Sequence, residues 1–153
     1  MLIATNIDEY EIDNIYLCES IKNTIIQNGR FTRILYTLPN FTINGIHVAI
    51  DLEKCNTDYI NNKCKCNFDI KKNINVINKI IQLEQNLLTS ISVKNKNKIY
   101  NLTQQLNTGS LRLFIEKGQH KTNSNSYILK IAGIWEDNDN YGITYKFIQT
   151  NHL

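Results

Sequence analysis

Residues 127–149, YILKIAGIWEDNDNYGITYKFIQ, constrain the fold more than any other stretch of the chain. Apolar and polar residues alternate with period two on both sides of the polar segment 137–140, a pattern typical of two β-strands joined by a turn. We therefore predict a hairpin of strands 127–136 and 141–149. Strict alternation would place the following residues of its first strand on one face: Tyr127, Leu129, Ile131, Gly133 and Trp135.

Two more strands are expected in the first third of the chain. Asn28-Gly29 is a turn signal before a strand at 30–38, and Pro39 closes a tight turn into a second strand at 41–52. The apolar parity of this second strand reverses at Gly45, which predicts a bulge or sharp bend there. Residues 12–17 could form a further strand. The polar, cysteine-bearing segment 53–69 is interpreted as a loop or an irregular excursion.

The middle of the chain has helical periodicity. Apolar residues recur at three- and four-residue steps over 71–90, which predicts an amphipathic helix interrupted by Glu84. A shorter helix is expected at 100–106 and a strand at 110–116. The order of strands, a helical insertion at about 71–106 and closing strands predicts one mainly β domain over residues 1–153. It suits an OB-like barrel of five to six strands, with an α+β sandwich as the alternative.

The composition is biased toward residues with A/T-rich codons, because Asn, Ile and Lys supply 62 of 153 residues. Lysine is therefore a weak functional signal, and the scarce arginines are more informative cations. The net charge of +3 permits nucleic-acid binding without requiring it. No apolar run approaches the roughly 18 residues that span a bilayer, and the N-terminus has no secretory pattern, so an intracellular, non-membrane protein is expected.

The strands combine cationic and aromatic residues in a way that suits a nucleic-acid surface. Guanidinium and ammonium groups bind phosphates, and aromatic rings on a sheet can stack on bases. The alternative is that alternating strand aromatics simply form the core. The predicted phosphate-contacting residues are Arg33, Arg112, Lys130 and Lys146, and Arg30, on the same strand as Arg33, is a further predicted nucleic-acid-binding residue. The predicted base-stacking residues are Tyr36, Trp135 and Tyr145.

No catalytic signature or phosphate-binding glycine cluster occurs, so neither an enzyme nor a cofactor is expected. The three histidines, His47, His120 and His152, are interpreted as structural or solvated residues. Cys55, Cys64 and Cys66 follow a C-x8-C-x-C spacing, to which Cys18 or His47 could add a fourth zinc ligand. Structural zinc sites usually contain C-x2–4-C pairs, so these cysteines are only weak metal candidates, and reduced thiols are the alternative.

Two segments together carry a family resemblance. NGRFTRILYTLPNFTINGIHVAIDL and ILKIAGIWEDNDNYGITYKF resemble motifs of small proteins of nucleocytoplasmic large DNA viruses and cytoplasmic linear plasmids, and the family is similar to viral single-stranded-DNA-binding proteins. The resemblance implies an oligonucleotide-binding barrel. The matched positions are Phe31, Arg33, Tyr36, Asn44, Gly45, Lys130, Gly133, Trp135, Tyr141, Gly142, Thr144, Tyr145, Lys146 and Phe147.

The resemblance implies a function in DNA replication. It predicts a sequence-tolerant single-stranded-DNA-binding protein in the host cytoplasm or viral factory, with replication proteins as further partners and homo-oligomers as an option. The run 148–153 lacks the acidic residues that recruit partners in many replicative single-strand binders, which puts recruitment by a tail in doubt. The alternative is a non-enzymatic structural or interaction protein of a DNA virus, such as a virion or assembly component.

Overall fold

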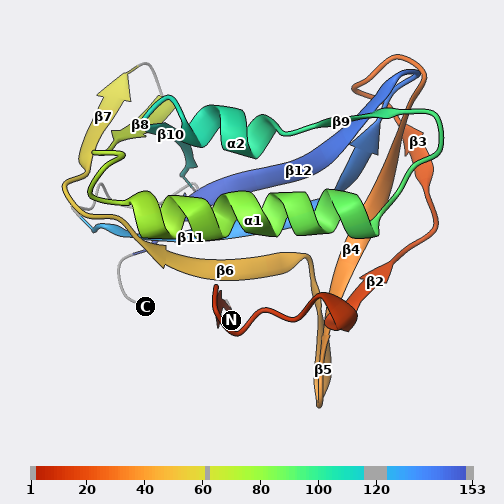
Figure 1. Ribbon diagram of the computed structural model, residues 1–153, viewed down its shortest axis with the longest axis horizontal. Coiled ribbons are helices and arrows are strands. Elements are labelled where there is room, and N and C mark those ends of the chain that lie inside the picture. Colours follow the sequence, from red (N-terminus) through yellow and green to blue (C-terminus); the bar gives the residue numbers. More distant parts are fainter. Residues whose placement is uncertain (1–2, 61–62, 116–123, 151–153) are drawn as a thin grey trace.

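The protein is mainly β-structure, which confirms the mainly β prediction, and the described part of the chain contains two α-helices. The computed structural model describes residues 3–60, 63–115 and 124–150 (Figure 1). The helical elements of this described part are η1 (Ile12–Asn14), α1 (Ile74–Ser90) and α2 (Asn101–Leu106). Its strands are β1 (Thr5–Asn6), β2 (Ile15–Leu17), β3 (Ile21–Asn23), β4 (Gly29–Leu38), β5 (Phe41–Asn44), β6 (Ile46–Asp51), β7 (Asn56–Ile60), β8 (Lys63–Asn67), β9 (Asn97–Ile99), β10 (Ser110–Phe114), β11 (Ser126–Glu136) and β12 (Asn140–Gln149).

The described strands form one mixed sheet. Its main path runs β1-β6-β11-β12-β10-β8-β7, and β4 joins β11 while also pairing with β2, β3 and β5. The terminal strands of this path, β1 and β7, do not pair with each other, so the described sheet is open. The OB-like barrel predicted from the sequence is therefore not confirmed by the described part of the chain.

The β11–β12 hairpin predicted from the sequence lies at the centre of this sheet. Two strands share the other edge of β11: β6 pairs along residues 126–131 and β4 along 133–136. The bend at Gly45 makes this division possible, since β5 continues on β4 while β6 turns onto β11. Gly45 has φ +89°, and its N–H donates to the Ile34 carbonyl at 2.9 Å. The predicted break at Gly45 is confirmed, and its positive φ favours glycine.

A β-bulge in β11 changes which residues of the hairpin face the core from those predicted. The register of β11 against β12 shifts between Ile131 and Gly133, so one extra residue reverses the parity of everything beyond it. Ile134 consequently enters the core, and Trp135 lies on the opposite face. Gly133 has no room for a side chain, because a Cβ there would lie 2.7 Å from the Phe31 ring. The prediction that Trp135 shares a face with Tyr127 was therefore wrong.

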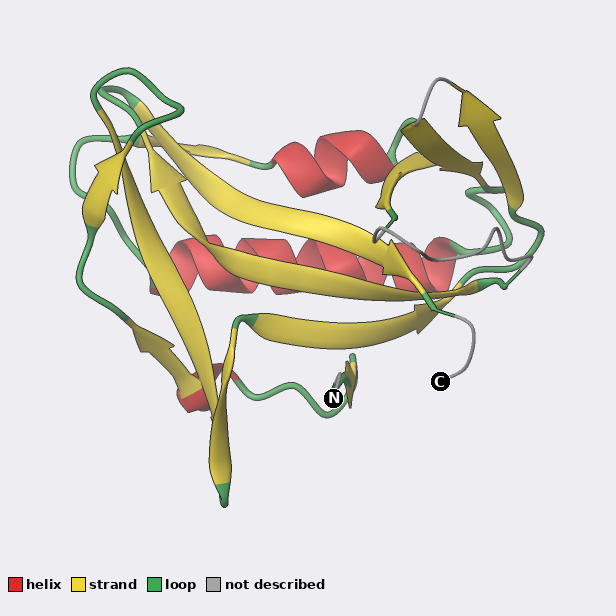
Figure 2. Ribbon diagram, turned by 180° about the vertical axis from the view of Figure 1, so that it is seen from behind, coloured by secondary structure: helices red, strands yellow, loops and turns green. Residues whose placement is uncertain are grey.

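Both α-helices lie within the predicted insertion and cover the same face of the sheet (Figures 1 and 2). No helix in the described part of the chain is long and apolar enough to cross a membrane. The core between α1 and the sheet contains the inward residues of β6, β11 and β12. From the helix it takes Ile77, Ile80, Leu83, Leu87 and Leu88.

The polar residue that interrupts the helical stripe has a structural function. Glu84 is fully buried, and its carboxylate accepts hydrogen bonds from the backbone N–H groups of Leu102 and Thr103 and from the Thr103 hydroxyl, at 2.6–3.0 Å. These contacts satisfy donors in the first turn of α2 and join the two helices. The position of α2 on the sheet therefore depends on a residue of α1.

The segment interpreted as a loop at 53–69 contains the antiparallel β7–β8 pair, so that interpretation was wrong. In β8, lysine and cysteine alternate over residues 63–66, and Cys64 and Cys66 are buried while Lys63 and Lys65 are exposed. Buried cysteine behaves as a small apolar residue, so this pattern is an ordinary period-two strand signal. The predicted strand at 110–116 is present as β10 and pairs with β8.

Candidate nucleic-acid interface

The sheet face opposite the α-helices carries four cationic residues and a histidine, each on one of five neighbouring strands. His47 of β6 lies opposite Lys130 of β11, which lies opposite Lys146 of β12. Leu113 pairs with Phe147, which places Arg112 of β10 next to Lys146, and Arg112 in turn lies opposite Lys65 of β8. We refer to His47, Lys130, Lys146, Arg112 and Lys65 as the cross-sheet row.

The alternation of each strand explains why the row faces away from the core. Every member stands between two neighbours whose side chains face the helices, as Lys130 does between the fully buried Leu129 and Ile131. Because side chains alternate across a strand, the row member points to the other side of the sheet. The two figures together show no α-helix covering that side in the described part of the chain (Figures 1 and 2).

The row places positive charges next to one another, and these charges are not neutralised by ion pairs within the described part of the chain. Residues directly opposite each other on antiparallel strands have Cβ atoms about 4.5–5.5 Å apart, and like charges at that spacing destabilise a sheet. None of the lysines or the arginine of the row forms an ion pair with a described residue. The nearest carboxylate in register is Asp58 on the edge strand β7, opposite Lys65, and it accepts a hydrogen bond from Asn67 at 3.0 Å.

The pKa of His47 is affected by its burial and by the positive charge of the row. Its pKa is lowered from the ordinary value of 6.5 by burial and then by the charges of Lys130 and Lys146, while a backbone hydrogen bond at Gly45 acts in the opposite direction. Its Nδ1 atom is buried and has no hydrogen-bond partner within the described residues. His47 is therefore neutral near pH 7, and a bound anion would favour its protonation.

One end of the row opens into a groove of about 910 Å³ between α2 and strands β8, β10 and β12. The groove lies where β10 separates from β12, since these strands pair only at Leu113–Phe147 and Phe114–Ile148. The cationic lining residues are Lys65, Arg112 and Lys146, and the aromatic ones are Phe114 and Tyr145. Four side-chain amides also line the groove: Asn67, Asn101, Gln104 and Gln105.

Two contacts organise the groove. The Lys146 ammonium lies 4.2 Å from the centroid of the Phe114 ring, within cation–π distance. The Tyr145 hydroxyl donates to Gln105 Oε1 at 2.7 Å. Burial and then the charge of Glu84 raise the pKa of Tyr145 to about 12, with Arg112 acting in the opposite direction. The hydroxyl therefore stays protonated and fixes the Gln105 amide.

The structure brings four of the eight predicted binding residues together: Arg112, Lys130 and Lys146 in the row, and Tyr145 in the groove. Tyr36 is a correction, because it is only 1% exposed and packs on Tyr10 with ring centroids 6.1 Å apart. Its hydroxyl accepts a hydrogen bond from the backbone N–H of Glu11 at 3.1 Å. A ring enclosed in this way has no face on which a base could stack.

The other three predicted residues lie toward the opposite end of β11. Arg33 is exposed and pairs in register with Gly133, and Trp135 lines an apolar hollow of about 540 Å³ with Phe31. Arg30 does not belong to a cationic surface, since its guanidinium donates to the Ser20 carbonyl at 2.7 Å and lies 3.9 Å from the Glu136 carboxylate. Lys96 also binds Glu136, at 3.1 Å.

Two members of the row were missed from the sequence. His47 was interpreted as structural or solvated, and Lys65 fell in a segment interpreted as a loop. The Lys-Cys alternation of residues 63–66 could have identified Lys65 as the outward residue of a strand. His47 had no comparable signal, because its importance depends on the pairing of β6 with β11, which no local pattern reveals.

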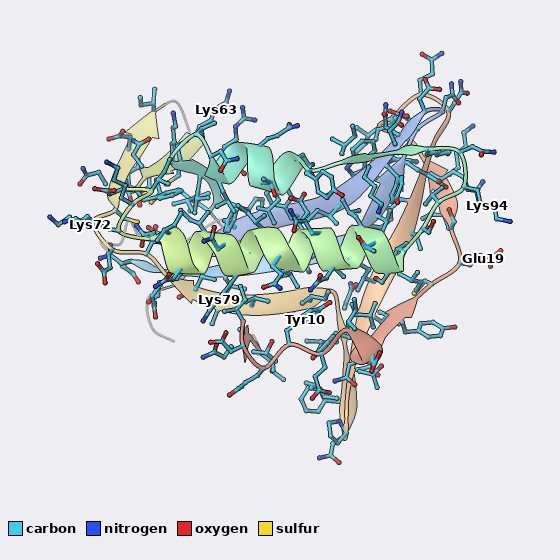
Figure 3. All side chains as sticks on the ribbon, viewed as in Figure 1. Tyr10, Glu19, Lys63, Lys72, Lys79 and Lys94 are labelled. Atoms are coloured by element: carbon cyan, nitrogen blue, oxygen red, sulfur yellow. The ribbon has the colours of Figure 1, made fainter. Side chains whose placement is uncertain are left out.

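Several described lysines outside the row lie apart from one another. Figure 3 shows Lys72 and Lys94 at opposite ends of the molecule, directed away from its body, and Lys79 directed toward the N-terminal segment. The Lys79 ammonium lies 2.8 Å from the Asp8 carboxylate. Lys117 and Lys121, and the histidines His120 and His152, lie outside the described residues.

Cys55, Cys64 and Cys66 lie close together as a cluster of thiols. Within the described residues, no group of three or more His, Cys, Asp or Glu side chains is placed to hold a metal ion. The Tyr127 hydroxyl donates to the Cys66 thiol at 3.2 Å. A hydrogen bond from Cys66 lowers the pKa of Cys55 to about 7, and burial raises the pKa of Cys64.

Comparisons of the chain with protein families, with curated proteins and with solved structures find no match.

Proposed function

We propose that the chain is a non-enzymatic, sequence-tolerant single-stranded-DNA-binding protein, and that the cross-sheet row holds the phosphates of the strand. The observation that supports this function best is the alignment of the row. Lys130 has a histidine on one side and a second lysine on the other, and Lys146 continues toward Arg112. A sheet that places like charges directly opposite each other loses stability unless an anion neutralises them.

The geometry of the row favours an extended polyanion. Neighbouring strands lie about 4.8 Å apart, so a row across five strands extends over roughly 19 Å. Its cations therefore present several binding points to one backbone, and lysine and arginine that contact only phosphates do not discriminate between bases. A flexible single strand can follow a sheet face, whereas direct readout of a duplex requires an element that enters a groove.

The biological setting is a further part of the proposal. The motifs around Arg33 and around Trp135 resemble those of viral and plasmid proteins, which supports a function in cytoplasmic replication of an A/T-rich viral or plasmid genome. Replication proteins would be further partners, and self-association would help to cover a long strand. An OB-like barrel is the fold that this resemblance implies, but the row requires only an open sheet face.

Fluorescence anisotropy of dye-labelled oligo-dT tests the function. We expect binding at low salt and a linear fall of log K with log salt concentration. The slope should be about −3, because single strands contribute about −0.7 for each neutralised phosphate and four permanent cations are available. Absence of binding at low salt, or an affinity that does not depend on salt, would contradict the proposal.

A second candidate function, that of a structural or assembly protein, is supported by exposed apolar residues near the N-terminal strands. Ile25 is 93% exposed and Tyr16 is 62% exposed, and Ile21 lies between them in the chain. Exposed apolar patches are a common feature of protein–protein contacts. Light scattering discriminates between the candidates: a defined oligomer that forms without nucleic acid, together with no binding of oligo-dT, would favour the assembly protein.

A further inference from the structure

The groove at the end of the cross-sheet row has features that phosphate binding does not explain. Two of its lining residues are aromatic and four are amides, whereas phosphates require only cations and N–H donors. Amide side chains and an accessible ring are the groups with which proteins bind nucleobases. The groove therefore offers base-binding chemistry next to phosphate-binding chemistry.

We propose that this groove binds one nucleobase of the strand whose phosphates lie along the row. The inference rests on the proposed function and makes it more specific. Most of the strand would then be bound through its backbone alone, and one nucleotide would be held by its base, between α2 and strands β8, β10 and β12. The protein would thus distinguish a nucleic acid from other polyanions at a single position.

Phe114 provides the stacking surface. It is a large apolar side chain that is 48% exposed, although the Lys146 ammonium already lies 4.2 Å from its ring centroid. A cation near one side of the ring is compatible with a base stacked on the ring, and the same ammonium can hold the adjacent phosphate. Stacking and charge are therefore available within one nucleotide of each other.

The amides provide unpaired polar atoms for a base edge. Asn101 lies on α2 with its Nδ2 group donating to the Ile143 carbonyl at 3.3 Å, but its Oδ1 atom is buried without a hydrogen-bond partner in the described part of the chain. Gln105 accepts from Tyr145 through Oε1, and its NH₂ group makes no hydrogen bond with a described residue. One free acceptor and one free donor suit a base edge, because each base presents both kinds of group.

The charges around the groove agree with a nucleotide as the occupant. Lys65, Arg112 and Lys146 line it, and no carboxylate is among its lining residues in the described part of the chain. Asp58 is close in register but is on the edge strand and bonded to Asn67. A base entering the groove would therefore have cations beside its flanking phosphates.

The test compares two chains of equal length and charge: oligo-dT and an abasic deoxyribose-phosphate oligomer. Their affinities are measured by competition against labelled oligo-dT for the wild-type protein and for Phe114→Ala. We expect Phe114→Ala to weaken oligo-dT binding about tenfold, within the range for loss of one stacked base, and to leave the abasic oligomer unaffected. Lys130→Ala should weaken the binding of both ligands.

Phe41→Ala is the matched control, since Phe41 is also about half exposed, at 45%, but lies in β5, which projects beyond the rest of the sheet (Figure 1). If Phe114→Ala weakens both ligands equally, or has no more effect than Phe41→Ala, the groove does not bind a base and the inference is overturned while DNA binding stands. If wild-type protein binds no oligo-dT at all, the proposed function fails and the groove inference fails with it.

Discussion

The two ends of β11 place cations on the sheet in opposite electrostatic surroundings. At the Glu136 end, Arg30 and Lys96 share one carboxylate, which is largely buried with 15% of its side chain exposed. In the other half of the strand, Lys130 lies between His47 and Lys146, and neither lysine has a carboxylate partner among the described residues. The same residue types therefore form an ion-pair network in one place and a region of positive potential in the other.

This difference shows that the charge of the cross-strand neighbour determines whether a cation on a strand stabilises or destabilises the sheet. A cation opposite a carboxylate adds stability, whereas a cation opposite another cation costs stability. Proteins keep such unfavourable arrangements mainly at functional sites, where the ligand supplies the missing charge. The contrast between the two ends of β11 therefore makes predictions about both binding and stability.

Reversing the charge in the middle of the row should have the largest effect. The double variant Lys130→Glu/Lys146→Glu is expected to weaken oligo-dT binding about 100- to 1000-fold at low salt, because two phosphate contacts become repulsive and counterion release is lost. Anisotropy titration measures this change. Arg30→Glu is the control at the other end, where binding should change by less than about threefold; an equal loss in both variants would show that only net charge matters.

Removing the charge of Glu84 should lower the free energy of unfolding, because Glu84 holds α2 beside the end of the cross-sheet row. Glu84→Gln keeps the volume of the side chain but removes one acceptor for the α2 N–H groups and the negative charge at the first turn of that helix. A cost of about 2 kcal/mol is expected for a buried, charge-assisted network of this kind. Urea denaturation measures it. Gln82→Glu on the exposed side of α1 is the control, and a cost below about 0.5 kcal/mol for Glu84→Gln would mean that α2 does not depend on this residue.

The features that depend on local residue patterns could be predicted from the sequence. The hairpin, the break at Gly45 and both helices follow from periodicity and turn residues, and three of the five row members were identified from strand cations. The bulge at Ala132 was not predicted, so Trp135 was assigned to the wrong face, because one inserted residue leaves the apolar pattern almost unchanged.

Register between distant segments could not be predicted in the same way. The row joins residues 47, 65, 112, 130 and 146, and their alignment depends on which strands pair and at which residue. A one-residue shift of any one of these strands would turn its member of the row toward the core. Tyr36 shows the same limit: its sequence neighbours allow either face of β4, and its burial results from packing on Tyr10.

His47 allows a smaller test, through pH. Its pKa is lowered in the folded protein, so its stabilising effect as a neutral residue is present above about pH 6.5 and is lost as the pH falls. A bound polyanion favours the protonated form, so affinity for oligo-dT should rise several-fold between about pH 7.5 and about pH 5.5. Titrations of wild type and His47→Gln at matched ionic strength measure the difference, and the same rise in both would assign it to another group, such as Cys55.

The last prediction has the smallest expected effect, but it compares the two ends of β11 most directly. Lys130→Gln removes a charge that faces His47 and Lys146, so the free energy of unfolding should increase by about 0.2–1 kcal/mol while affinity for oligo-dT falls. Arg30→Gln removes a charge that faces Glu136, so the free energy of unfolding should decrease, by at most about 1 kcal/mol because the pair is partly exposed, with affinity unchanged. Thermal or urea denaturation without DNA determines both signs. A loss of stability in both variants would show that Lys130 is a structural residue of the sheet, whereas opposite signs would show that the sheet tolerates repulsion at the row in order to bind an anion.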